Sequence, residues 1–203
     1  MDKAITQLVC DLKADDPHIR FAAARTLGEI GMGNSLACHA LTEALDDRTW
    51  FVRLAALQSL KDLKVSPHVV FERIVPLLKD DQEDVREYAA LTIGDLGSEA
   101  GVVLSSLTEA LSDPVWYVRC TVATVLGEIG PKARPARGYL MKCLDDDEVE
   151  VRLAALGTIG LLWCEEDNEV IEVLEELTRT DAQPLAVREK ARDVLARMRG
   201  VGG

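Results

Sequence analysis

Aromatic side chains are scarce in this sequence of 203 residues, where three Trp, three Tyr and three Phe make up only 4% of the chain. Such a composition argues against a β-sandwich, whose strands are usually rich in aromatic residues. The core must instead be filled by Leu, Ile, Val and Ala, which favours packed helices. No run approaches the roughly 20 apolar residues of a membrane-spanning helix, and the N-terminal stretch does not have the pattern of a signal peptide.

Cysteine and histidine are also few, and neither is arranged for chemistry. The five cysteines are scattered without a C-x-x-C pair, which predicts reduced thiols in a cytoplasmic protein. None of the three histidines is followed by glutamate or belongs to an H-x-x-x-H motif, so no metal site is predicted. The sequence also lacks a G-x-S-x-G nucleophile motif and a glycine-rich phosphate loop. We therefore expect no enzyme activity and no cofactor.

Positive charge is in deficit, since 35 acidic residues against 23 basic ones give a net charge of −12. Nucleic acids and anionic membrane surfaces attract Lys and Arg, so neither is an expected partner. An acidic protein attracts basic segments of other proteins. The expected partner is therefore another protein that presents a helix, a loop or a basic tail.

What the sequence does contain is an internal repeat. A Val–Arg or Ile–Arg pair recurs every 33 residues, and the sixth pair follows after 36, with the extra residues near Pro184. The arginines of these pairs are Arg20, Arg53, Arg86, Arg119, Arg152 and Arg188. A column of the same register holds Leu12, Leu45, Leu78, Leu111, Leu144 and Leu177. Matches over this many positions indicate six copies of one structural unit.

Each copy predicts a pair of helices. In the first copy Ile5, Leu8 and Leu12 are spaced i, i+3, i+7, and residues 19–30 continue with one-face spacing in which Ile19 is a core position. An acidic turn separates the two segments, and its aspartates are expected to cap the second helix. The glycines expected to end that helix are Gly31, Gly97 and Gly130.

A single hairpin is too small to bury its own apolar faces, so the copies must stack. The sequence therefore predicts an all-α fold, a right-handed α-α superhelix (α-solenoid) of six helical hairpins in one domain, residues 1–203. The expected copies are residues 1–33, 34–66, 67–99, 100–132, 133–166 and 167–203. Arg192 and Arg199 replace small or apolar residues of the earlier copies, as expected of a capping unit.

Segments such as DQEDVREYAALTIGDLG and DPVWYVRCTVATVLGEIG share the pattern D-x-x-x-x-V-R-x-x-A-A-x-x-L-G-x-I-G. This pattern resembles HEAT repeats, most closely the short prokaryotic PBS-lyase HEAT-like subtype, over essentially the whole chain. The resemblance implies that the second helices line a concave side. It also implies that the six recurring arginines form a structural ladder with turn aspartates of neighbouring units.

Two functions are compatible with this resemblance. The leading one is a non-catalytic scaffold that binds a partner segment on an acidic and aromatic concave face. The alternative is a bilin-lyase-type or chaperone-like enzyme subunit, because the subtype takes its name from lyases of the E/F type that act on phycobilin chromophores.

The predicted binding face follows from helix geometry. At 100° per residue, positions −1, +2, +6 and +10 from each recurring Val or Ile lie opposite the core positions, and there acids alternate with Phe, Tyr and Leu. The residues expected to bind a partner, with two tryptophans at the edge of this sector, are Phe21, Arg25, Trp50, Phe51, Leu54, Gln58, Asp84, Glu87, Leu91, Asp95, Trp116, Tyr117, Cys120, Glu150 and Leu153. The pairs Trp50–Phe51 and Trp116–Tyr117 occupy the same slot in two copies, either as exposed anchors or as packing against a neighbouring copy.

Overall fold

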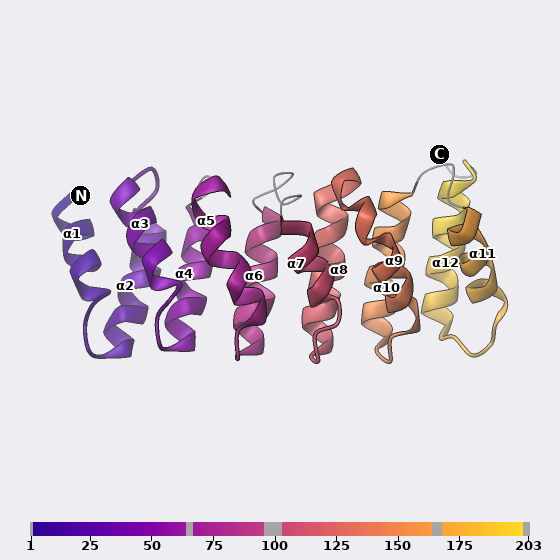
Figure 1. Ribbon diagram of the computed structural model, residues 1–203, viewed down its shortest axis with the longest axis horizontal. Coiled ribbons are helices and arrows are strands. Elements are labelled where there is room, and N and C mark those ends of the chain that lie inside the picture. Colours follow the sequence, from indigo (N-terminus) through magenta and orange to yellow (C-terminus); the bar gives the residue numbers. More distant parts are fainter. Residues whose placement is uncertain (1, 64–66, 96–102, 164–167, 201–203) are drawn as a thin grey trace. The chain divides into compact units, whose positions relative to one another are not determined.

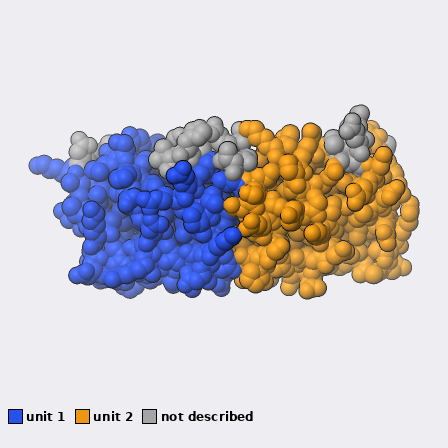
Figure 2. Space-filling model, viewed as in Figure 1, with its two compact units in different colours: residues 1–103 blue, residues 104–203 orange. Residues whose placement is uncertain are grey.

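The helices follow the 33-residue repeat. The computed structural model describes residues 2–63, 67–95, 103–163 and 168–200, which form successive helix pairs (Figure 1). The chain divides into two compact units, residues 1–103 and 104–203, drawn in different colours in Figure 2. The predicted all-α architecture of helical hairpins is confirmed in each unit.

Unit 1 contains three helix pairs. Its elements are α1 (Asp2–Asp11), α2 (Pro17–Ile30), α3 (Ser35–Ala44), α4 (Trp50–Asp62), α5 (Pro67–Ile74), the 3-10 helix η1 (Val75–Lys79) and α6 (Glu83–Asp95). Pro76 explains η1, because proline has no N–H to continue the α-helical hydrogen bonding, and the chain tightens into a 3-10 helix that begins one residue before it. The second helices of the pairs are neighbours, since α2 contacts α4 and α4 contacts α6.

Unit 2 repeats this order. Its elements are α7 (Leu104–Ala110), α8 (Trp116–Ile129), η3 (Gly130–Ala136), α9 (Arg137–Lys142), η4 (Cys143–Asp145), α10 (Val149–Leu162), α11 (Asn168–Arg179) and α12 (Leu185–Met198). The second helices α8, α10 and α12 contact one another in that order. Each unit therefore has one row of second helices, and the first helices form another (Figure 1).

The repeating apolar columns form the core of each unit. The second-helix column that is buried throughout holds Leu27, Leu60, Ile93, Leu126, Ile159 and Leu195. Burial of each such side chain contributes roughly 1.5–3 kcal/mol relative to its exposure to water. These columns hold successive hairpins together, because one hairpin alone cannot cover them.

The first hairpin departs from this pattern at Ile19. Its side chain is 46% exposed, whereas Val52 in the same column is fully buried. The column faces the preceding hairpin, and no described helix precedes α1. The prediction that Ile19 is a core position is therefore wrong.

The turn aspartates act differently from the predicted helix caps. Asp16 does cap α2, since its carboxylate accepts the backbone N–H of His18 at 2.8 Å. In later turns the aspartate accepts the N–H two residues on, as Asp47 does from Thr49 at 2.8 Å. The cap residues of α4, α8 and α10 make no side-chain capping bond. These aspartates therefore fix the turn before the helix. Among the described turns before α2, α4, α8 and α10, the prediction that the aspartate caps the helix holds for Asp16 alone.

Two of the three predicted terminal glycines end second helices. Gly130 has a φ of 73°, a region that favours glycine. Gly31 has a φ of −88°, and glycine is required there for space, because a Cβ would lie 2.4 Å from the Leu27 carbonyl oxygen. Gly97 lies outside the described residues.

Each unit contains a close contact between two neighbouring second helices. Ser59 Oγ on α4 donates to the Ala24 carbonyl on α2 at 2.9 Å, and a Cβ on Gly28 would lie 2.5 Å from that Oγ. Thr158 Oγ1 on α10 donates to a carbonyl of α8 at 2.7 Å, beside Gly127. Glycine thus allows the neighbouring second helices to approach until a hydroxyl reaches the backbone.

Candidate protein-interaction surface

The recurring arginines of unit 1 join one turn to the next. Arg20 Nε donates to Asp47 Oδ2 at 2.7 Å, and its Nη2 donates to Oδ1 at 2.9 Å. Its Nη1 donates to the Ala14 carbonyl of its own hairpin at 2.8 Å. Arg53 pairs with Asp80 in the same way, at 2.7 and 2.6 Å. Such bidentate, charge-assisted pairs fix both distance and orientation.

Arg119 makes the same contacts in unit 2. Its Nε and Nη2 both donate to the Asp146 carboxylate at 2.7 Å, and the two side chains are only 15% and 11% exposed. Burial acts to raise the pKa of the Asp146 carboxyl, but hydrogen bonds from Arg119 and from the Glu148 N–H outweigh it. The net pKa of Asp146 is therefore lowered, and it stays ionised in the pair.

The other recurring arginines have different surroundings. Arg86 donates to the Asp80 carbonyl at 3.0 Å. Arg152 donates through Nη1 to backbone carbonyls of its own turn, but its buried Nε has no hydrogen-bond partner. Arg188 pairs with Asp181 of its own hairpin at 2.7 Å, and its Nε also lacks a partner. The bidentate pair between hairpins is thus present at Arg20, Arg53 and Arg119 and absent at Arg152.

Four rings meet where α2 and α4 begin, and we call His18, Phe21, Trp50 and Phe51 the aromatic cluster. Phe51 lies at its centre, with ring centroids 5.5 Å from His18, 5.8 Å from Phe21 and 5.7 Å from Trp50. The Arg25 guanidinium lies over the Phe21 ring at 6.0 Å. Trp50 is 39% exposed, His18 is exposed, and the two phenylalanines are half-buried. The cluster therefore presents apolar surface to solvent.

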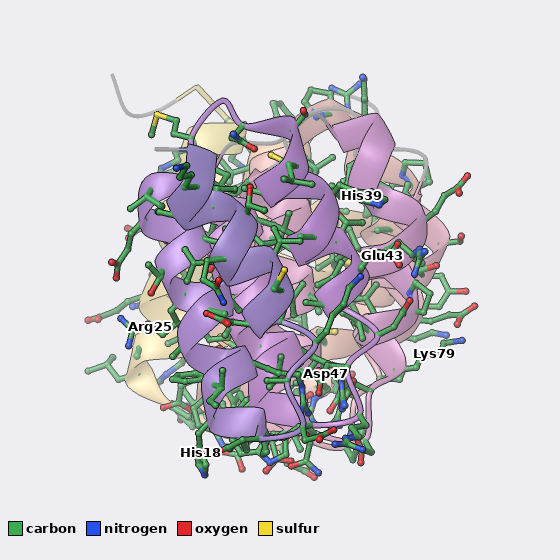
Figure 3. The ribbon with its side chains drawn as sticks, turned by 90° about the vertical axis from the view of Figure 1, so that its left-hand side faces the viewer. His18, Arg25, His39, Glu43, Asp47 and Lys79 are labelled. Carbon is green, nitrogen blue, oxygen red and sulfur yellow. The ribbon has the colours of Figure 1, made fainter. Side chains whose placement is uncertain are left out.

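The remaining predicted binding residues of unit 1 are Leu54, Gln58, Asp84, Glu87, Leu91 and Asp95. Asp84 and Asp95 are exposed and the others are half-buried. Asp95 forms an ion pair with Lys61, with 2.8 Å between Asp95 Oδ2 and Lys61 Nζ. Arg25 lies on the side of the unit opposite His39 and Glu43 of α3 (Figure 3). The predicted residues of unit 1 thus belong to the second-helix side.

The predicted residues of unit 2 lie on α8 and α10. Trp116 is 41% exposed and meets Tyr117 edge-on at 5.8 Å. Cys120 lies 3.7 Å from the Glu150 carbonyl, which places these two residues together. Glu150 is exposed, and Tyr117, Cys120 and Leu153 are half-buried. Unit 2 therefore carries a smaller aromatic surface than unit 1.

The first-helix side has a depression at the same place of the repeat in each unit. In unit 1 it has a volume of about 310 Å³, and Leu36 and His39 of α3 line it. In unit 2 it has a volume of about 420 Å³ and is lined by Tyr139 and Lys142 of α9, whose ammonium lies 5.2 Å from the ring centroid. The sequence predicted no binding residue among Leu36, His39, Tyr139 and Lys142, because these four positions follow no recurring column.

Reactive groups are sparse in the described ranges. Burial is the larger cause and the charge of Asp146 the smaller cause that raise the pKa of the Cys143 thiol to about 11. The thiol is therefore protonated at neutral pH. In residues 2–63, 67–95, 103–163 and 168–200, no three His, Cys, Asp or Glu side chains are grouped to hold a metal ion. None of the helices in these ranges is sufficiently long and apolar to span a membrane.

Comparison with known proteins agrees with this geometry. A family model described as HEAT repeats matches residues 2–61 and 104–196. A solved engineered protein is 20% identical, with a TM-score of 0.69 over 100% of this chain and 98% of that chain. A designed armadillo repeat protein in complex with the peptide (KR)4 is 21% identical, with a TM-score of 0.70 over 95% of this chain and 98% of that chain.

Computationally designed armadillo repeat proteins for modular peptide recognition are also similar, at 22% identity and a TM-score of 0.64 over 93% of this chain and 97% of that chain. At these identities the likeness shows the fold alone. No curated protein matches the chain in sequence. The bilin-lyase alternative is not favoured by these matches.

Proposed function

The chain belongs to the HEAT-repeat family, and on that premise we propose that it is a non-catalytic scaffold that binds a basic segment of another protein. The segment lies along the second-helix side of unit 1, against α2, α4 and α6. Trp116 and Tyr117 give unit 2 a further contact region of the same kind.

The aromatic cluster is the observation that carries this proposal. Its rings touch one another but remain partly in contact with water. The repeat does not require aromatic residues in this slot, because α6 has Glu83 and Asp84 there. Large, stiff aromatic side chains gain the most from being covered at an interface. A partner that covers Phe51 and Trp50 would remove apolar surface from water.

The charge of this side favours a basic partner. Exposed Asp84 and half-buried Glu87 lie on α6, next to the helix that carries Phe51 and Trp50. The net charge of −12 adds long-range attraction for a basic chain. The designed armadillo repeat protein of the same fold was solved with the basic peptide (KR)4, which supports this partner class.

Fluorescence anisotropy with labelled (KR)4 peptide tests the proposal. We expect Phe51→Ala to weaken binding about tenfold or more, as loss of a central aromatic anchor does. Tyr139→Ala is the matched control, because it removes an aromatic side chain that is 48% exposed on the first-helix side of unit 2. Equal affinity of the wild type and the folded Phe51→Ala variant would rule out this surface.

A charge series provides a second arm. The double variant Asp84→Asn/Glu87→Gln should bind the peptide more weakly and lose part of the salt dependence of the affinity. The control Glu72→Gln/Glu169→Gln removes the same charge from exposed positions on the first helices α5 and α11. If both double variants weaken binding equally, the acids of α6 have no specific role.

A further inference from the structure

Buried polar side-chain atoms without hydrogen-bond partners occur in the last two hairpins of unit 2. Within the described parts of the chain these side-chain atoms are Arg152 Nε, Trp163 Nε1, Gln183 Oε1 and Arg188 Nε. Arg152 lies on α10 and Trp163 directly follows it, whereas Gln183 and Arg188 belong to the turn and helix of the last hairpin. All four belong to the last two hairpins of unit 2, and Arg152 is the one whose ladder partner would come from the last hairpin.

The sequence of the last turn explains the orphaned Arg152. In the complete pairs the aspartate follows its arginine by 27 residues, as Asp146 follows Arg119. The last hairpin is shifted by three further residues, so the position that corresponds to Asp146 is Ala182. In the register of the repeat, a methyl group thus replaces the carboxylate of the complete pairs. Asp181 does not substitute for it, because it pairs with Arg188 of its own hairpin.

The hairpin of α11 and α12 is held against α10 mainly by apolar packing. Leu156 and Ile159 of α10 are buried, as is Val194 of α12. A Cβ on Gly160 would lie 3.1 Å from Val194 Cγ1, so the two helices approach closely. Apolar contact is non-directional, whereas a bidentate arginine pair fixes position. The last hairpin therefore docks without the directional contact that links α8 to α10.

We infer that α11 and α12 form a detachable element that opens from α10 as one unit. Opening gives water to Arg152 Nε, which is buried without a partner, and this reduces the net cost of separation. Opening of α10 from α8 would instead break the pair of Arg119 and Asp146. Sub-global opening of this kind makes the α10 surface around Gly160 available, which makes the junction a built-in conformational switch. The inference does not depend on the proposed function.

Hydrogen exchange of the full chain, resolved by peptide or residue, tests the switch. In the wild type, α11 and α12 amides should exchange together and faster than those of α8. In Ala182→Asp, which places a carboxylate within the ladder register, their exchange should slow about tenfold or more while α8 is unchanged. Ala182 is exposed, so the substitution itself does not disturb the core.

Ala14→Asp is the matched control. Ala14 occupies the same column in the first hairpin, where no described helix supplies an arginine from a preceding hairpin. This variant should leave the exchange of α12 within twofold of the wild type, roughly the scatter expected of a surface change. The inference is wrong if Ala14→Asp slows α12 as much as Ala182→Asp, if α12 exchanges as slowly as α8 in the wild type, or if Ala182→Asp slows all helices equally.

Discussion

The two junctions of α10 are built from different contacts. Toward α8, Arg119 reaches the Asp146 carboxylate, and Thr158 donates to a backbone carbonyl beside Gly127. Toward α12, Arg152 has no carboxylate, and the close contact at Gly160 is with the apolar Val194. One helix therefore has a hydrogen-bonded neighbour on one side and a mainly apolar one on the other.

This difference separates two contributions to a repeat protein. Apolar columns are present at both junctions, so they are sufficient to stack hairpins. The arginine ladder fixes the position of one hairpin relative to the next. It also gives hydrogen-bond partners to guanidinium and carboxylate groups that would otherwise be buried without them. The contrast predicts that equivalent substitutions will have unequal effects at the two junctions.

Arginine substitutions should give the largest contrast. Arg119→Met leaves the largely buried Asp146 carboxylate without its cation and should cost about 3 kcal/mol of unfolding free energy. Arg152→Met removes the bonds from Nη1 to two backbone carbonyls but breaks no pair with a carboxylate, so it should cost less, about 1 kcal/mol. Urea unfolding followed by circular dichroism measures both, and equal losses would show that the two junctions do not differ in this way.

Glycine substitutions should give the next contrast. In Gly127→Ala the new Cβ would meet Thr158 Oγ1 at 2.8 Å, so overpacking and a displaced hydroxyl should cost about 2 kcal/mol. Gly160→Ala should cost about half as much, because the Cβ meets only Val194 methyl groups, at 3.1 Å. Thermal and urea unfolding of the two variants test the order. The reverse order would place the tighter packing at the α12 junction.

Acid should weaken the complete junction selectively. The pKa of Asp146 is lowered in the folded protein, so its pair stabilises the fold above the unfolded pKa and loses that contribution as pH falls. Between about pH 5 and pH 2, Arg119→Met should therefore lose stability less steeply than the wild type. Arg152→Met should change the profile less than Arg119→Met does, because the charge of Arg152 lowers the pKa of Asp146 less than the hydrogen bond from Arg119 does. Identical slopes in urea melts of all three proteins would contradict the assignment.

Gly157→Ala should have the smallest effect, and in the opposite direction. Gly157 lies within α10, where a new Cβ would approach nothing closer than Lys190 Cε at 3.7 Å. The substitution should raise stability by up to about 1 kcal/mol, because alanine is the better helix former. A loss of stability in the same urea assay would show that space, and not helix propensity, governs this part of α10.

The fold was predictable because its signal repeats. Leucine and isoleucine columns at a constant spacing identify the hairpins, and each column averages out local irregularity. Ile19 shows the limit of this reasoning, since its burial depends on a neighbouring hairpin and not on its own column. The turn aspartates show another limit, because a carboxylate that pairs with an arginine 27 residues away is not distinguished locally from a helix cap.

The candidate surface was predictable only in part. The column numbering placed Phe21 and Phe51 on the second-helix side, and the contact between their rings depends on how α2 and α4 are staggered. The close approach of these helices involves Gly28, which the repeat motif marks, and Ser59, which it does not. The sequence shows alanine at position 182 in the column of the ladder aspartates. That Arg152 therefore lacks a carboxylate partner could be recognised only from the geometry of the complete pairs. Partner binding by these residues stays a prediction.

The hairpin of α3 and α4 contains both halves of the ladder. Its Asp47 accepts from Arg20 of the hairpin before, and its Arg53 donates to Asp80 of the hairpin after. A module with complementary ends can be duplicated or removed as a whole while the flanking hairpins still find matching partners. We therefore expect that such an array can lengthen or shorten by whole hairpins, because each new junction would join the same arginine and aspartate positions.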